Sequence, residues 1–159
     1  AVAVTLRPVV DGFALPDIAI DAEGKVSRSE NALRPALSGF TIEVDGVAVG
    51  TAGNEAIRLA PGIRQVTVSR SGYESWSKRV EVREGLVLEV ALAPTAEALA
   101  RIRAHTELLS GLAQGAKLNA AEVERIRAAA QALRNSGFKV DLKVDAKELP
   151  ETVIVPPSR

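Results

Sequence analysis

The residue best suited to acid–base chemistry is His105, the single histidine of a chain that contains no cysteine. A catalytic histidine needs a nucleophile or substrate within hydrogen-bond reach and a carboxylate that orients it. One helical turn away, however, lie Arg101 and Ile102 on one side and Leu108 and Leu109 on the other. Phosphate-binding glycine loops and the H-E-x-x-H and G-x-S-x-G motifs are absent. We therefore expect His105 to occupy an ordinary helix position, and we predict no catalytic residue and no enzyme activity.

Acidic residues gather loosely near the start of the chain, at Asp11, Asp17, Asp21 and Glu23. Hard cations require several oxygen ligands that converge from one tight loop. The Asp21–Gly24 stretch lacks the third ligand and the distal glutamate of a calcium loop. A calcium site is the alternative, but solvated loop carboxylates are favoured. The lack of cysteine excludes zinc–thiolate sites and disulfides, so we predict no metal and no cofactor.

Two aromatic residues, Tyr73 and Trp76, are close enough in sequence to form one surface. Together they could stack on sugar rings as a binding platform. They could equally pack over the end of a small fold, because each ring can bury about 150–250 Å². We favour packing and keep the platform as the alternative.

The bulk composition narrows the partner classes. The chain is 47% hydrophobic and 25% charged, as is usual for a globular protein, with only 3% aromatic residues. Twenty basic and twenty acidic residues balance, which argues against nucleic acid or an anionic membrane surface as partner. The longest apolar runs fall well short of the about 20 residues that span a bilayer.

The N-terminal residues have the small character found around a signal-peptidase cut, Ala1-Val2-Ala3. A processed secretory signal and a start within a longer protein both fit this observation.

Four segments follow one another, at residues 1–39, 40–94, 95–137 and 138–159. In the first segment, alternating apolar residues predict strands at residues 2–6, stopped by Pro8, and at 18–20. The stretch from Lys25 to Ser38 is polar and broken by Pro35, so we expect a loop there.

The second segment, residues 40–94, has short alternating runs separated by turn signals. Asp45-Gly46 is the dipeptide that best tolerates the positive φ angles of a tight hairpin. Pro61-Gly62 and Glu84-Gly85 mark further turns. Turns about every 8–12 residues are typical of a small sandwich or barrel. We predict strands at residues 40–44, 47–49, 56–60, 66–68, 76–82 and 86–92. A unit of this size buries only about 60% of its unfolded surface, so we expect it to depend on its flanks.

This segment resembles the PEGA domain. The matching strings are I-E-V-D-G-V-A-V-G at residues 42–50, L-A-P-G at 59–62, V-T-V at 66–68 and S-G-Y-E-S-W at 71–76. Two departures are the absence of a proline in Thr51–Gly53 and the presence of Arg64-Gln65 where histidine often stands. The resemblance implies a small β-sandwich with a binding or structural role in secreted or envelope proteins. It transfers no catalytic residue.

The third segment predicts two helices. Thr95 can cap a helix that runs to about Gln114, and Asn119 with Glu122 forms a capping box for the next. Gly137 is placed for a left-handed helix end. We expect an antiparallel hairpin joined by about four residues around Gly115. Its alanine-rich stretch is a candidate assembly surface, formed by Ala128, Ala129 and Ala132, although simple packing onto the sheet is the alternative.

In the last segment, Phe138, Val140, Leu142 and Val144 alternate with charged residues, which predicts an amphipathic strand. We expect this strand to pair with one from residues 1–39, with the helices covering one face of that sheet. Residues 153–155 are a candidate final strand in a proline-containing tail.

These observations predict an α+β protein: a small antiparallel, PEGA-like β-sandwich with a C-terminal helical hairpin and an added amphipathic strand. The expected function is a non-enzymatic scaffold or assembly module of the cell envelope, located in the periplasm, secreted or on the cell surface. Its partners would be other envelope proteins or copies of itself. The alternative is a glycan- or peptidoglycan-binding module that uses Tyr73 and Trp76.

Overall fold

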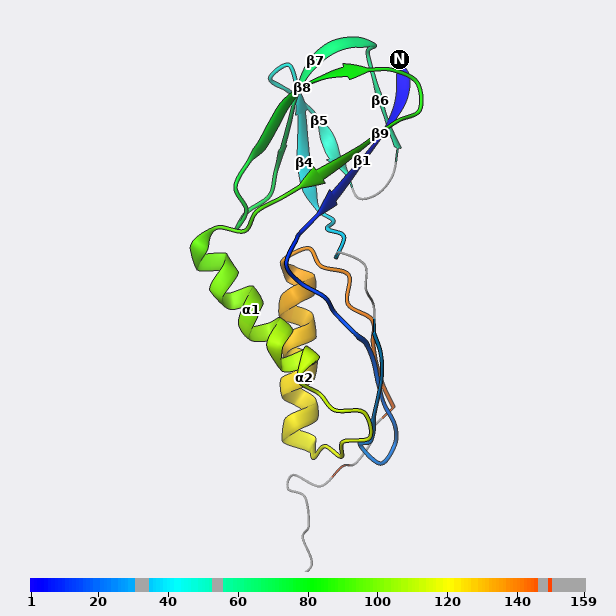
Figure 1. Ribbon diagram of the computed structural model, residues 1–159, viewed down its shortest axis with the longest axis vertical. Helices are drawn as coiled ribbons and strands as arrows, with labels where there is room; N and C mark the ends of the chain where they lie inside the picture. Colours follow the sequence, from blue (N-terminus) through cyan, green and yellow to red (C-terminus); the bar gives the residue numbers. More distant parts are fainter. Residues whose placement is uncertain (31–34, 53–55, 146–148, 150–159) are drawn as a thin grey trace, which may run out of the picture. The chain divides into compact units, whose positions relative to one another are not determined.

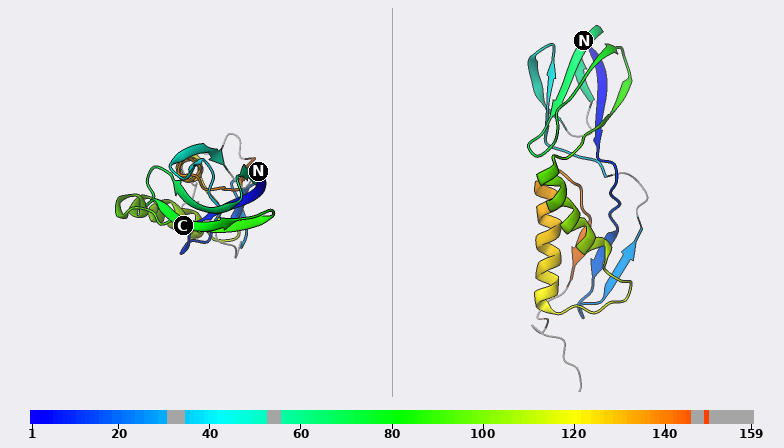
Figure 2. Two further views of the ribbon diagram at one scale, coloured as in Figure 1. Left: turned by 90° about the horizontal axis from the view of Figure 1, so that it is seen from above. Right: turned by 60° about the vertical axis from the view of Figure 1, so that its left-hand side comes forward.

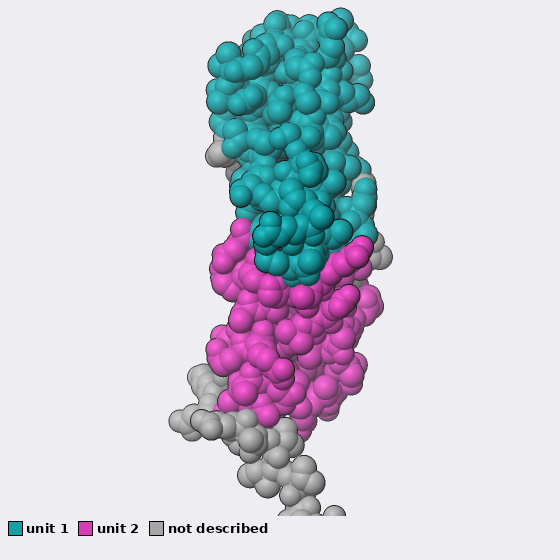
Figure 3. Space-filling view, turned by 90° about the vertical axis from the view of Figure 1, so that its left-hand side faces the viewer, with its two compact units in different colours: residues 1–13, 34–102, 136–139 teal, residues 14–33, 103–135, 140–159 magenta. Residues whose placement is uncertain are grey.

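The computed structural model describes residues 1–30, 35–52, 56–145 and 149. It has two compact units, each built from three stretches of chain (Figure 3). Unit 1 comprises residues 1–13, 34–102 and 136–139, and unit 2 comprises residues 14–33, 103–135 and 140–159. The candidate strand at 153–155 and Gly53, one of the departures from the PEGA pattern, lie outside the described residues.

Unit 1 contains two sheets that enclose one core, as the sandwich prediction requires (Figures 1 and 2). The buried inner residues include Val4, Leu6 and Val90 in one sheet and Phe40 and Val68 in the other. The four-stranded sheet has the order β5 (Val47–Ala52), β4 (Phe40–Val44), β7 (Gly62–Ser69), β8 (Trp76–Val82). The three-stranded sheet has the order β6 (Ala56–Leu59), β1 (Val2–Val9), β9 (Leu86–Ala91).

The turn predicted between β4 and β5 is confirmed. Val44 pairs with Val47, so Asp45 and Gly46 form a two-residue loop with φ angles of 52° and 80°. Two positive φ angles define a type I′ turn, whose twist matches that of the strands. The Asp45 carboxylate also accepts a hydrogen bond from the Gln65 amide at 2.9 Å, which lowers the pKa of that carboxyl. The side chain thus fixes the turn to β7.

The central strand of the three-stranded sheet comes from outside the PEGA-like segment. β1 pairs antiparallel with β6 and parallel with β9, so the sandwich is not wholly antiparallel. β1 also continues to Val9, beyond Pro8, where we expected it to stop. Pro8 accepts a hydrogen bond from the Leu37 amide, and N and O of one residue in a strand point the same way. The backbone nitrogen of Pro8, which carries no hydrogen, therefore faces away from β9. The proline thus removes no hydrogen bond from the β1–β9 ladder.

Unit 2 contains a three-stranded sheet in the order β10 (Leu142–Val144), β2 (Asp17–Ile20), β3 (Val26–Ser29). β10 pairs parallel with β2, which confirms the prediction that the C-terminal strand joins one from residues 1–39. Ile18, Ile20 and Val26 are buried on the face that α2 covers (Figure 2). The opposite face carries the exposed residues of all three strands.

β3 corrects the prediction of a loop after Lys25. The strand has one apolar residue, Val26, and the next inward position is Arg28. The guanidinium of Arg28 donates to the carbonyls of Ser110 and Leu112, each at 2.6 Å, and pairs with Glu30. Arg28 thus satisfies the carbonyls at the end of a helix. A strand with a charged residue in its inner row gives no period-two apolar signal, which explains why it was missed.

The first helix, α1 (Ala96–Ser110), begins as predicted, because the Thr95 hydroxyl accepts the Ala98 amide at 3.2 Å. It ends four residues before Gln114, the predicted end. The Gln114 side chain instead accepts the Arg28 amide at 2.8 Å and so occupies the outer edge of β3. The connection to the second helix therefore spans residues 111–119, which is longer than expected.

The second helix, α2 (Ala120–Asn135), has the predicted capping box, with Asn119 and Glu122 exchanging hydrogen bonds of 2.8 and 3.1 Å. Gly137 follows it with a φ of 96°. The predicted strand over 138–145 is shorter than expected, because Phe138 pairs with Leu37 and only Leu142–Val144 pairs with β2. No helix in the described part of the chain is long and apolar enough to cross a membrane.

Candidate functional sites

The corner that carries Tyr73 is used for internal contacts. Tyr73 is 7% exposed, and its hydroxyl donates to the Ser136 carbonyl at 2.9 Å. Burial raises the pKa of Tyr73 to about 12, although the charge of Arg70 opposes this shift. The ring therefore does not offer its face to a ligand. This placement favours packing over a sugar platform.

Arg70, which the sequence did not single out, completes this corner. Its Nε donates to the Ser136 carbonyl at 3.2 Å, and its Nη1 donates to the Gly39 carbonyl at 2.9 Å. A Cβ at Gly137 would lie 2.6 Å from Nε. It would also lie 2.9 Å from the Ser38 carbonyl oxygen, so the backbone of Ser38 and the positive φ angle both favour a glycine there. The sequence pointed to Gly137 as a helix end but gave no indication of the role of Arg70.

Trp76 differs from Tyr73 in its exposure. It pairs with Val68 and shares the inner face of β8, yet its side chain is only half-buried. Because the Tyr73 ring is buried, it does not add to the exposed aromatic surface of Trp76. The structure does not bring the two rings together as an open platform.

The acidic residues near the N-terminus do not form a metal site. Among the described residues, no group of three His, Cys, Asp or Glu side chains is arranged to hold an ion. The Asp21 carboxylate accepts the amides of Lys25 at 2.9 Å and Glu23 at 3.0 Å. The hydrogen bond from the Lys25 amide contributes most to lowering the pKa of Asp21, and the bond from Glu23 adds to it. Both bonds close the turn between β2 and β3.

His105 lies half-buried on α1. No hydrogen bond or ion pair within the described residues joins it to a carboxylate or a hydroxyl.

The three alanines of the candidate assembly surface differ in their exposure to solvent. Ala129 is 2% exposed and belongs to the core of unit 2, Ala128 is exposed and Ala132 is half-buried.

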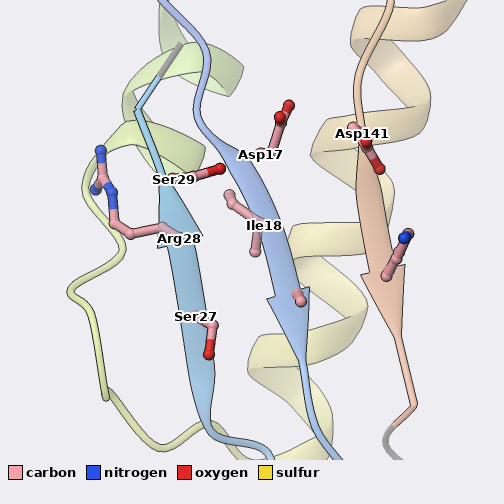
Figure 4. Close-up of a pocket in the computed structure, with 8 residues that line it drawn as sticks. Asp17, Ile18, Ser27, Arg28, Ser29 and Asp141 are labelled. Carbon is pink, nitrogen blue, oxygen red and sulfur yellow. The ribbon is translucent and has the colours of Figure 1, made fainter.

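A hollow lies on the outer face of the sheet of unit 2 (Figure 4). Its volume is about 380 Å³. The strand register places Asp141, Asp17 and Ser29 side by side across the three strands, and Lys143, Ala19 and Ser27 in the next row. We refer to these six residues as the sheet-face site. The Arg28 side chain points away from it, toward the end of α1 (Figure 4).

Sequence patterns indicated only part of this site. Asp17 belongs to the acidic group considered above, and Asp141 and Lys143 are the charged residues that alternate with the apolar ones of the C-terminal strand. Ser27 and Ser29 were missed with β3. The missing information was the register between strands more than 110 residues apart in the sequence, which no local pattern encodes.

The comparison with protein families agrees with the fold of unit 1. The family model of the PEGA domain matches residues 35–96. This match confirms the resemblance predicted for residues 40–94, and it covers β4 to β9. It excludes β1 and the strands of unit 2. No curated protein matches the chain.

Proposed function

We propose that this chain is a non-catalytic structural or assembly module of the cell envelope. PEGA domains are typical of periplasmic and extracellular proteins, and residues 35–96 match that family. The partners would be other envelope proteins or further copies of this chain.

The observation that carries this proposal is the use of the Tyr73 corner. Its hydroxyl and the Arg70 guanidinium both donate to the Ser136 carbonyl. One aromatic residue of the PEGA-like corner, Tyr73, thus holds the fold together. A residue with this role supports a structural module better than a glycan-binding one.

The placement of His105 supports a non-enzymatic role. The sheet-face site does not include it, and no described carboxylate or hydroxyl lies in hydrogen-bond contact with it. A general base must reach the proton that it removes, directly or through one water molecule. His105 lacks the second group that would orient it for this task.

The test of the assembly role is the mass of the full chain in solution, measured by size-exclusion chromatography with light scattering across a range of concentrations. We expect a species heavier than the 16.7 kDa monomer. A monomer at every concentration, together with no protein captured from envelope extracts, would contradict the proposal.

Glycan binding is the alternative, and the half-exposed ring of Trp76 favours it. Its test is retention on insoluble peptidoglycan, with Trp76→Ala as the variant and Trp76→Phe as the matched control. Under our proposal, Trp76→Ala lowers the free energy of unfolding by about 2 kcal/mol, less than the about 3–5 kcal/mol of a fully buried aromatic residue. Retention of the native chain that Trp76→Ala abolishes and Trp76→Phe preserves would establish the alternative.

A further inference from the structure

The sheet-face site brings like charges together without neutralising them. Leu142 pairs with Ile18, which places Asp141 next to Asp17 on the outer face. Neighbouring strands lie about 4.8 Å apart, and like charges directly opposite each other are destabilising. No side-chain hydrogen bond or ion pair within the described residues involves either carboxylate. Both therefore remain available to a cationic ligand.

The centre of the site is open because its residues are small. Ala19 occupies the middle position of the three strands, with Ser27 beside it on β3. These short side chains leave the hollow of about 380 Å³. Small-molecule sites usually measure about 300–1,000 Å³, so an amino-acid-sized ligand fits.

The first row carries three oxygen acceptors, at Asp141, Asp17 and Ser29, which lie at one level in Figure 4. A primary ammonium group has three N–H donors and no acceptor. Three acceptors of which two are charged match this group in number and in sign. Asp17 and Ser29 stand on strands and Asp141 directly precedes one, and such positions are held more rigidly than loops.

The second row supplies the opposite charge. Lys143 lies two residues after Asp141, which is a Cα–Cα separation of about 6.7 Å in extended chain. Its ammonium group has no described partner and can bind a carboxylate. The site therefore has a row of acceptors with two carboxylates and, in the next row, a cationic residue beside Ala19.

We propose that the sheet-face site binds a small zwitterion that carries a primary ammonium group at one end and a carboxylate at the other. The ammonium lies between Asp17 and Asp141, and the carboxylate pairs with Lys143. Lysine-like amino acids and short peptides that carry such a group belong to this class. This site is independent of the assembly role proposed above.

The probe is 6-aminohexanoate, titrated into the full ¹⁵N-labelled chain and followed by amide chemical shifts. Hexylamine and hexanoate each retain one of its two charges, and Ca²⁺ tests for a simple cation site. We expect millimolar affinity for 6-aminohexanoate, with shifts centred on β2, β3 and β10, and weaker binding of both single-charge probes.

Three variants test the roles of the residues. Asp17→Asn and Asp141→Asn should each weaken 6-aminohexanoate by about tenfold or more, because each removes a charge-assisted contact. Lys143→Gln should remove the preference for 6-aminohexanoate over hexylamine. Glu124→Gln is the matched control on α2, where the carboxylate pairs with Arg127, and should bind as the native chain does.

The stability of the variants gives a second readout. Because Asp17→Asn relieves repulsion from Asp141, that variant should melt at or above the native temperature. Loss of binding with retained stability supports the proposal. The absence of shifts at about 50 mM probe, equal binding by Asp17→Asn, or a response to Ca²⁺ but not to 6-aminohexanoate would overturn it.

Discussion

A pair of glycines in unit 2 allows steric contact to be separated from backbone strain. Gly24 and Gly115 have φ angles of 82° and 83° and lie near the same bridge, which joins Lys25 to Lys117. A Cβ at Gly24 would lie 2.5 Å from the Leu118 carbonyl oxygen. At Gly115 the nearest atom is the flexible end of Lys25, at 3.9 Å. Substitution by alanine thus imposes the same strain at both positions, but a backbone clash at only one.

The magnitudes follow from these contacts. A left-handed φ costs an L-residue about 1–2 kcal/mol. The unfolded chain has less conformational entropy with alanine than with glycine, which offsets about 0.4–1 kcal/mol of this cost. Gly115→Ala should therefore lower the free energy of unfolding by about 1 kcal/mol. Gly24→Ala must also move the Leu118 backbone, whose amide donates to Gly24 at 2.9 Å. Weakening that bond adds about 1–3 kcal/mol.

The assay is urea denaturation of both variants and the native chain, with the midpoint compared at constant slope. Hydrogen exchange at the Leu118 amide supplies a local measurement, and it should accelerate in Gly24→Ala alone. If the two variants lose the same stability within about 0.5 kcal/mol, the close contact of Gly24 with the Leu118 carbonyl does not exist as described.

Three further outcomes are expected. Gly46→Val should cost at least about 1 kcal/mol, since a β-branched residue must adopt a φ of 80°; an unchanged melting temperature would place the turn elsewhere. Asn119→Ala should cost about 1 kcal/mol through loss of the N-cap, while Asn119→Asp, which keeps the cap, should melt near the native temperature. Because the pKa of Tyr73 is raised from 10.0 to about 12, the unfolded chain ionises first and stability should fall between those pH values. Tyr73→Phe should reduce this loss, and an equal loss would contradict the burial of the phenol.

Local signals predicted the local features of this fold. The turn at Asp45-Gly46 and the capping box at Asn119 depend on residues adjacent in sequence, and both are confirmed. The pairing of the C-terminal strand with one from residues 1–39 was predicted because an apolar strand face cannot remain unpaired. Each of these inferences could be drawn from the residue types of the segment itself, without knowledge of its partner.

Several other features set by distant contacts were wrong or missing. β3 was missed because Arg28, an inner-row residue, is stabilised by the carbonyls at the end of α1. The end of α1 was placed too late because Gln114 binds the backbone of β3. The sheet-face site was incomplete for the same reason, since it depends on β3 and on the register of β2 with β10. In all three cases the deciding partner is remote in the sequence.

The interleaved strand pairings, β1 with β9 and β2 with β10, determine when each part of the chain can fold during synthesis. β1 and β2 leave the ribosome well before their parallel partners, β9 and β10, are made. The PEGA-like sandwich cannot close its three-stranded sheet until residue 91 has emerged, and the sheet of unit 2 waits for residue 144. Pairings of such long sequence separation slow folding, because loop-closure entropy is lost before the contacts form. Truncated products that end within the helices would contain every strand of the sandwich but not the Ser136 carbonyl that Tyr73 and Arg70 bind, and their β2–β3 hairpin would lack β10.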